Sequence, residues 1–170
     1  MNLKLTAIAS QWHDLLEACG EHGPRLLMSV EEYLTDAKVP GVSWAYQSYT
    51  TGLLGEFIQA RRREHLVIRA AGIHSVVAVN ARKFGTLLAV SWYLVPAPTL
   101  LKAIRQRLSV SEDEPRVSHE IADLPAFERA DLAAFVTLTR LALRFSIRLL
   151  VGKEGKSLLA DPPLPDGLQE

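Results

Sequence analysis

Cysteine is almost absent from this chain of 170 residues: Cys19 is the only one, so no disulfide can form within the chain. A lone cysteine is typical of proteins in reducing compartments, and we expect a cytoplasmic protein. Cys19 falls on the apolar face of a predicted helix, which favours core packing over a role as a nucleophile.

Motifs for nucleotides, metals and cofactors are also missing. Neither the Walker pattern nor Gly-x-Gly-x-x-Gly occurs, which argues against a nucleotide-binding α/β enzyme. His13 and Glu17 have helical i, i+4 spacing, but no third metal ligand stands at a diagnostic distance from them. We therefore predict no metal site and no cofactor, and we assign no catalytic residue.

Long apolar runs without charge or proline are scarce. Phe84–Leu101 has 18 uncharged residues, but Pro96, Pro98 and an alternating pattern favour a buried strand followed by a turn. Leu132–Val151 is interrupted by three arginines, each of which would cost about 2.5–3.5 kcal/mol near a bilayer centre. The first ten residues are too weakly apolar for a secretory signal. We expect a soluble protein without a transmembrane segment, and peripheral membrane contact stays open.

Charge is segregated along the chain, although the net charge is zero. Residues 57–111 carry nine basic side chains and one acidic one, Glu64, whereas residues 1–56 and 112–170 each have a net charge of −4. A basic middle between acidic flanks indicates an anionic partner, within the chain or outside it. The candidate contacts in this segment are Arg61, Arg62, Arg63, Arg82, Lys83, Lys102, Arg105 and Arg107.

The first elements are predicted to be helical. Apolar residues at spacings of three and four predict a helix over Leu5–Cys19. Ser29 and Glu32 resemble a capping box, which predicts a second, short helix over Val30–Ala37. A turn at Pro40 and Gly41 and the β-prone aromatic stretch Val42–Tyr49 then predict a strand.

Three further strands are predicted over His65–Ala71, His74–Ala81 and Thr86–Val95. Their short connections require antiparallel pairing. All three are apolar on both faces, so both faces of the sheet need cover, from helices or from a second copy of the protein. Residues 52–64 fit a helix somewhat better than a strand, and both alternatives stay open.

The second half of the chain predicts a helix over Pro98–Leu108, an acidic loop at Glu112–Glu114 and a long helix from Pro125 to Val151. The predicted fold is therefore α+β: a three- or four-stranded antiparallel sheet, packed with an N-terminal helical pair and a long C-terminal helix. Residues 1–152 are predicted to form a single domain, and residues 153–170, with two glycines and three prolines, a flexible tail.

The long helix carries a row of arginines at i, i+4 and i+8: Arg140, Arg144 and Arg148. The simplest interpretation is that the row is the solvated edge of an otherwise apolar helix. The alternative is that the guanidinium groups bind an anion, such as phosphate, a carboxylate ligand or the acidic loop of the same chain.

Three classes of function follow from these patterns. The leading hypothesis is a non-enzymatic interaction or assembly module that self-associates through apolar surfaces of the sheet and the last helix, because apolar surface is abundant and no catalytic set is present. The expected contact residues are Phe135, Leu138, Leu141, Phe145 and Leu149.

The second class is a binder of nucleic acid, an acidic lipid surface or a phosphate ligand through the basic segment. Few aromatic residues accompany the basic ones there, and a solvated surface is the simpler interpretation. The third class is an enzyme or small-molecule binder with a pocket between sheet and helix. Its mark would be a cavity lined by His65, His74 or His119 together with converging polar groups.

Overall fold

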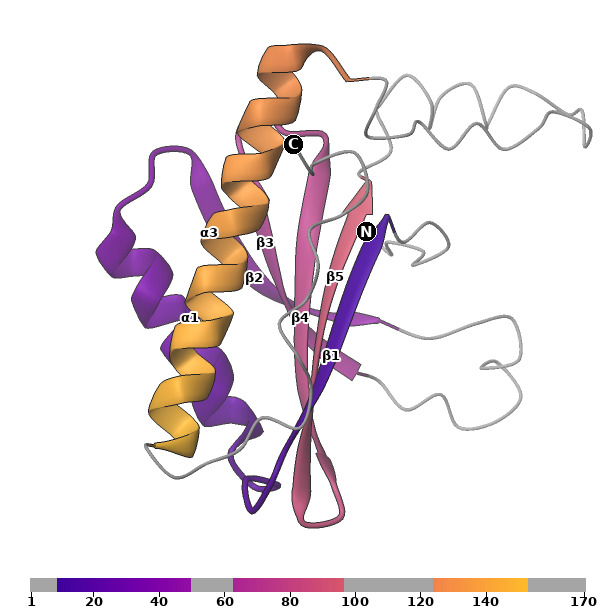
Figure 1. Ribbon diagram of the computed structural model, residues 1–170, viewed down its shortest axis with the longest axis vertical. Coiled ribbons are helices and arrows are strands. Elements are labelled where there is room, and N and C mark those ends of the chain that lie inside the picture. The colour runs from indigo at the N-terminus through magenta and orange to yellow at the C-terminus, as the bar shows by residue number, and fades with distance from the viewer. Residues whose placement is uncertain (1–8, 50–62, 97–123, 153–170) are drawn as a thin grey trace, which may run out of the picture.

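The computed structural model describes residues 9–49, 63–96 and 124–152 (Figure 1). These residues form one five-stranded antiparallel sheet, in the strand order β1-β5-β4-β3-β2, and two helices. The elements are β1 (Ser10–Leu16), α1 (Gly23–Ala37), β2 (Val42–Tyr49), β3 (Arg63–Ala70), β4 (Ser75–Phe84), β5 (Leu87–Pro96) and α3 (Ala126–Val151).

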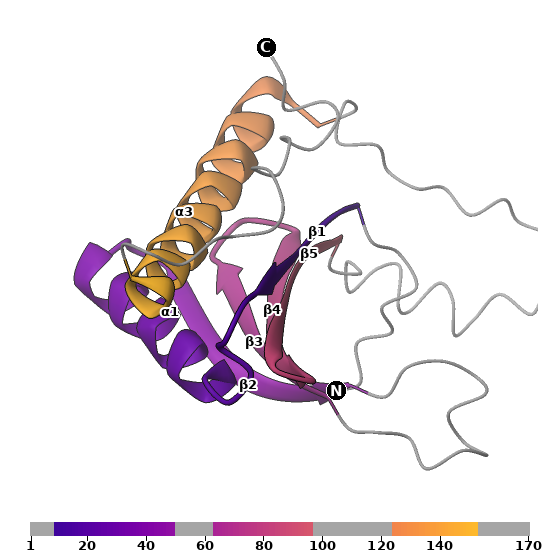
Figure 2. The ribbon, with the colours of Figure 1, turned by 60° about the horizontal axis from the view of Figure 1, so that its bottom comes forward.

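Both helices lie on the same side of the curved sheet, and Figure 2 shows the two layers edge-on. The core between the layers combines the apolar faces of α1 and α3 with one face of the strands. The predicted α+β class with an antiparallel sheet is confirmed. The sheet has five strands instead of three or four, and a strand with one helix stands where a helical pair was predicted.

The prediction of a helix over Leu5–Cys19 is wrong, because residues 10–16 form β1. The strand pairs with β5 along its whole length, from Ser10 opposite Leu94 to Leu16 opposite Leu88. The same sequence contains an alternating pattern that places Trp12 and Leu16 toward the core and His13 toward the other side. The sequence fits both a helical and an alternating period, and pairing with the edge of β5 selects the strand. His13 and Glu17 therefore do not lie one turn apart on a helix.

Helix α1 is longer than predicted, since Val30–Ala37 is only its second half. Pro24 occupies its first turn, where the missing amide hydrogen costs nothing, and Ser29 lies within the helix instead of capping it. Gly23 permits a close approach to the sheet, because a Cβ atom there would lie 3.0 Å from the carbonyl oxygen of Ala81. The helix therefore begins in contact with β4.

The strands predicted from the middle of the chain are confirmed as β2, β3, β4 and β5, with bounds that differ by a few residues. Gly72 follows β3 with φ of 81°, and Gly85 connects β4 to β5 with φ of 65°. A positive φ is readily adopted by glycine, which explains why these two residues stand at the turns.

Apolar burial on both sides of the sheet is also confirmed. The helix-facing side includes the fully buried Leu66, Ile68, Val77 and Leu94. A second, smaller cluster on the opposite side contains Val67, Val76, Ala78 and Val95, each at most 5% exposed.

Several predictions concern residues outside the described ranges: the choice between helix and strand for residues 52–62, the helix 98–108, the acidic loop 112–114 and the tail 153–170. The predicted long helix is confirmed as α3, which ends at Val151 before Gly152. Within the described ranges, neither helix has the length and apolar character needed to span a bilayer.

Candidate functional site

Helix α3 carries an exposed row of large apolar side chains. Leu141, Phe145 and Leu149 follow one another at intervals of four and are 47%, 47% and 57% exposed. Leu138, three residues before Leu141, is half-buried at the edge of the core. We call these four residues the α3 apolar stripe.

The stripe borders α1, because the ring of Phe145 lies 5.3 Å from that of Tyr33, measured between centroids. Of the five contact residues expected from the sequence, the stripe contains all but Phe135. That side chain is only 4% exposed and belongs to the core of the same chain, so we leave it out of the candidate surface.

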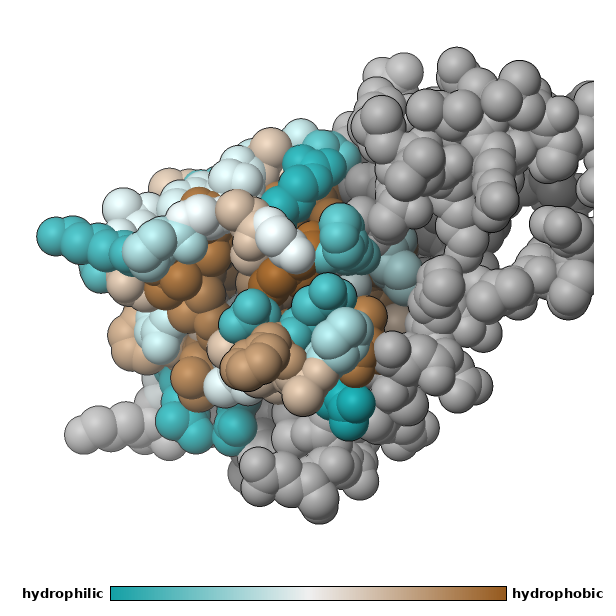
Figure 3. All heavy atoms as spheres, turned by 90° about the horizontal axis from the view of Figure 1, so that it is seen from above, coloured by the Kyte–Doolittle hydropathy of each residue, from teal (hydrophilic) through white to brown (hydrophobic). Residues whose placement is uncertain are grey.

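Exposed apolar side chains occur elsewhere too, among them Met28 on α1 and Phe84 on β4. The face seen from above in Figure 3 shows hydrophobic residues interspersed with hydrophilic ones. The distinguishing feature of α3 is therefore the regular spacing of its exposed residues along one helix, and not the mere presence of apolar area.

The arginine row lies on the other flank of α3 and is not uniformly solvated. The Cζ atom of Arg140 is 5.6 Å from the ring centroid of Trp92 on β5, and the indole Nε1 of Trp92 donates to Thr139 Oγ1 at 3.3 Å. Arg144 is half-buried, and it lines a small cavity of about 10 Å³ together with Arg140, Leu143, Trp12 and Trp92. Arg148 is exposed. The first two arginines therefore contribute to packing between α3 and the sheet.

The other basic candidates divide into two groups. Arg82 and Lys83 are exposed on the β4–β5 hairpin, where Lys83 forms an ion pair with Glu21. The side chain of Arg63 and the residues Arg61, Arg62, Lys102, Arg105 and Arg107 lie outside what the structure describes. The described part of the chain therefore brings no larger basic cluster together.

Of the three histidines expected to mark a pocket, the two that the structure describes, His65 and His74, do not share a cavity. His13 Nδ1 lies 3.0 Å from Ser91 Oγ, and its ring centroid lies 5.5 Å from that of Tyr93. The ring centroid of the buried His65 lies 6.3 Å from that of Tyr93. His74, just before β4, is exposed, and His119 lies outside the described ranges. Among the residues that the structure places, no group of three or more His, Cys, Asp or Glu side chains is arranged to hold a metal ion.

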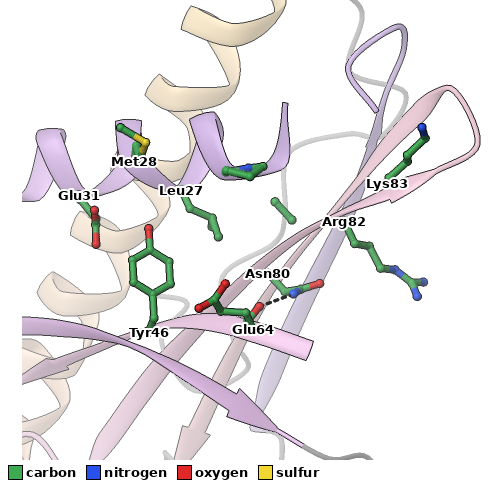
Figure 4. Close-up of a pocket in the computed structure, with 10 residues that line it drawn as sticks. Leu27, Met28, Glu31, Tyr46, Glu64, Asn80, Arg82 and Lys83 are labelled. Carbon is green, nitrogen blue, oxygen red and sulfur yellow. Dashed lines mark hydrogen bonds between the residues drawn. The ribbon is translucent and has the colours of Figure 1, made fainter. Parts of the chain in front are cut away.

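A cavity of about 650 Å³ opens between α1 and the sheet (Figure 4). The cavity exists because β3 separates from β4. The pairing of these two strands ends at Leu66 and Val79, whereas β4 stays paired with β5 as far as Phe84. Asn80 stands at the separation and donates from Nδ2 to the backbone oxygen of Glu64 at 2.6 Å. The cavity is lined by Pro24, Leu27, Met28, Glu31, Tyr46, Glu64, Asn80, Ala81, Arg82 and Lys83.

Two carboxylates converge on one phenol in this cavity. The pKa of Tyr46 is raised above its ordinary value, first by burial, then by the charge of Glu31, which also accepts a hydrogen bond from the phenol, and by the charge of Glu64. Figure 4 shows Tyr46 of β2 directed toward Glu31 of α1, with the Glu64 carboxylate of β3 on the same side. Neither carboxylate forms an ion pair with another described residue.

The third class of function placed a pocket between sheet and helix, but sequence reasoning did not identify the residues of this cavity, because they come from four elements that only the sheet register brings together. One signal was present: Glu64 is the single acid in the basic segment 57–111. Neither His65 nor His74, two of the three histidines expected to mark a pocket, lines the cavity, and His119 lies outside the described ranges.

Comparison of the chain with protein-family models, with curated proteins and with solved structures found no match.

Proposed function

We propose that this protein is a non-enzymatic interaction module that self-associates through the α3 apolar stripe. The observation that carries the proposal is the run of Leu141, Phe145 and Leu149, about half exposed and aligned on one helix. Exposed apolar side chains at spacings of three and four are the pattern by which one helix packs against another.

A second copy of the chain is the partner that the charges of α3 favour. The exposed acids Glu128 and Asp131 lie near the start of the helix, and the exposed Arg148 lies in its last turn. A two-fold axis near Leu138 would make the two helices antiparallel, with the Glu128 end of each alongside the Arg148 end of the other. The stripe of each helix would then pack against the first half of the partner helix, where Phe127 is 88% exposed. The helix dipoles would then also run in opposite directions, which is favourable.

Light scattering after size exclusion tests the proposal. The measurement is made from micromolar to near-millimolar protein, at low and at high salt. We expect an oligomer that persists in high salt, because apolar association is not screened. The double variant Leu141→Ser with Phe145→Ser should be monomeric, with an unchanged circular dichroism spectrum. Phe84→Ser, at a residue that is 58% exposed on β4, is the matched control and should leave the oligomer intact.

A wild-type protein that is monomeric throughout this range would overturn the proposal. An assembly that dissolves in salt, together with binding of mixed-sequence nucleic acid at low salt, would favour the basic segment 57–111 and an anionic partner instead. Among the described residues, Arg82 is the exposed cation of that segment that could contribute without first leaving an ion pair.

A further inference from the structure

The cavity between α1 and β2, β3 and β4 has the dimensions of a small-molecule site. Its volume of about 650 Å³ lies within the range of about 300–1,000 Å³ that is usual for ligand pockets. One wall is apolar: Leu27 is buried in the core, Met28 is 55% exposed at the rim, and Pro24 and Ala81 continue the wall. A ligand there would bury an apolar body against α1.

Two acidic residues line the cavity, Glu31 from α1 and Glu64 from β3. The carboxylates of Glu31 and Glu64 both act on the hydroxyl of Tyr46, and neither has a cationic partner among the described side chains. Figure 4 shows the two cationic lining residues, Arg82 and Lys83, directed away from Tyr46, with Lys83 extending toward the end of the hairpin. The basic and acidic ends of the cavity are thus separate.

Two like charges held beside one apolar wall are complementary to one kind of small ligand. From this geometry we infer that the cavity binds an amphipathic organic cation, a protonated amine carried on a short apolar body. The ammonium group donates hydrogen bonds to Glu31 and Glu64, and the apolar body packs against Leu27 and Met28. A fixed array of acceptors meeting an ammonium ion gives charge-assisted hydrogen bonds, which are stronger than neutral ones.

Tyr46 has a positioning role in this site. Its hydroxyl is directed toward the Glu31 carboxylate, and their interaction favours a position of that carboxylate on the cavity side of α1. Asn80 positions Glu64 in a similar way, because its side chain donates to the backbone oxygen of Glu64 where β3 separates from β4. The site is independent of the proposed self-association, since its lining residues do not include the α3 apolar stripe.

Titration calorimetry with three matched probes tests the inference: phenethylamine, its neutral analogue phenethyl alcohol and the anionic 3-phenylpropionate. Phenethylamine should bind, the alcohol should bind about tenfold or more weakly because it lacks charge-assisted hydrogen bonds to the two carboxylates, and the anion should not bind at all. Amide chemical-shift changes in an NMR titration should be centred on Tyr46, Glu64 and the first two turns of α1.

Charge-removing variants locate the site. Glu31→Gln and Glu64→Gln should each weaken phenethylamine binding about tenfold and leave the weak binding of the alcohol unchanged. Glu32→Gln is the matched control, because Glu32 is the next residue of the same helix, is exposed and does not line the cavity. Tyr46→Phe should weaken binding a few-fold by freeing the Glu31 side chain.

Three outcomes would overturn the inference. The first is no heat and no shift change with phenethylamine up to ten millimolar. The second is equal binding of the amine and the alcohol, which would mean that the site is merely apolar. The third is an equal loss of binding in Glu31→Gln and Glu32→Gln, which would mean that the amine responds to the general negative charge of α1. None of these outcomes changes the oligomeric state, so they are distinct from failure of the self-association proposal.

Discussion

The guanidinium of Arg140 lies over the indole ring of Trp92, with Cζ 5.6 Å from the ring centroid. A cation over an aromatic face contributes about 0.5–2 kcal/mol, more when it is shielded from water. We expect Arg140→Met, which keeps the apolar stem, to lower the free energy of unfolding by about 1 kcal/mol in urea denaturation.

Arg148→Met is the control, because Arg148 belongs to the same row but is exposed at the last turn of α3. Its effect should be about 0.5 kcal/mol or less. Equal effects of the two substitutions would show that Arg140 is no more than the solvated edge that the sequence alone suggested.

Thr139 is the hydrogen-bond partner of the buried Trp92. Its hydroxyl accepts from the indole at 3.3 Å and donates to the backbone oxygen of Val136 at 2.9 Å. Thr139→Val keeps the shape but leaves the indole N–H unsatisfied in the core, so we expect a loss of about 1–3 kcal/mol in the free energy of unfolding. Thr139→Ser should retain most of the stability, although it loses a methyl group.

Thr137→Val provides the matched control, since Thr137 is exposed on the same helix two residues earlier. Denaturant midpoints of the three variants should fall in the order Thr137→Val, Thr139→Ser, Thr139→Val, from most to least stable. A Thr139→Val protein as stable as the control would contradict a structural role for the hydrogen bond.

The strands of the middle segment were predictable, because each short run of β-branched and aromatic residues is bounded by glycine or a polar turn. The long helix was predictable for a similar reason, since its apolar period continues without a break from Leu132 to Val151. In both cases local pattern and tertiary environment agree.

The N-terminal strand was not predictable from the same rules. Its apolar residues fit a helical period as well as an alternating one, and the choice depends on β5, which lies more than 70 residues further along the chain. The residues that line the cavity were not identified from the sequence for a related reason. Glu31, Tyr46 and Glu64 come from three elements, and only the tertiary arrangement of α1 with the sheet brings their side chains together.

The titration of Tyr46 predicts the direction in which the stability of the protein changes at high pH. Burial and the charges of Glu31 and Glu64 raise its pKa above 10.0, so the folded protein favours the neutral phenol. A group whose pKa is raised by folding contributes stability below its unfolded pKa and loses that contribution as the pH rises through the folded value. We therefore expect the wild type to lose stability above about pH 10 relative to Tyr46→Phe.

The pKa itself is measurable by NMR from the Cζ shift of Tyr46. Glu31→Gln should lower it more than Glu64→Gln, because Glu31 acts by both charge and hydrogen bond. The exposed Glu32→Gln, outside the cavity, should change it least. A Tyr46 pKa that does not respond to either cavity glutamate would contradict the convergence of the two carboxylates on the phenol.

Two glycines are required for different physical reasons, and substitutions can separate them. Gly85 has φ of 65° with open space around its missing side chain, whereas Gly23 has a carbonyl oxygen of Ala81 3.0 Å from where a Cβ atom would stand. Gly85→Ala should lower the free energy of unfolding by about 1–2 kcal/mol, the cost of a left-handed conformation for an L-residue. Gly85→Asn should recover part of that loss, because asparagine tolerates positive φ.

At Gly23 the alanine variant should be more stable than the asparagine variant, the reverse of the order expected at Gly85. The obstacle there is backbone, which cannot rotate away, so Gly23→Ala must shift the start of α1 from β4, and the larger Gly23→Asn must shift it further. We expect asparagine to be worse than alanine at this position, as measured by thermal unfolding of all four variants. Because α1 forms the apolar wall of the cavity, Gly23→Ala should also weaken phenethylamine binding, whereas Gly85→Ala should not. If asparagine rescued both positions equally, the close packing of α1 against β4 would not be what requires glycine at residue 23.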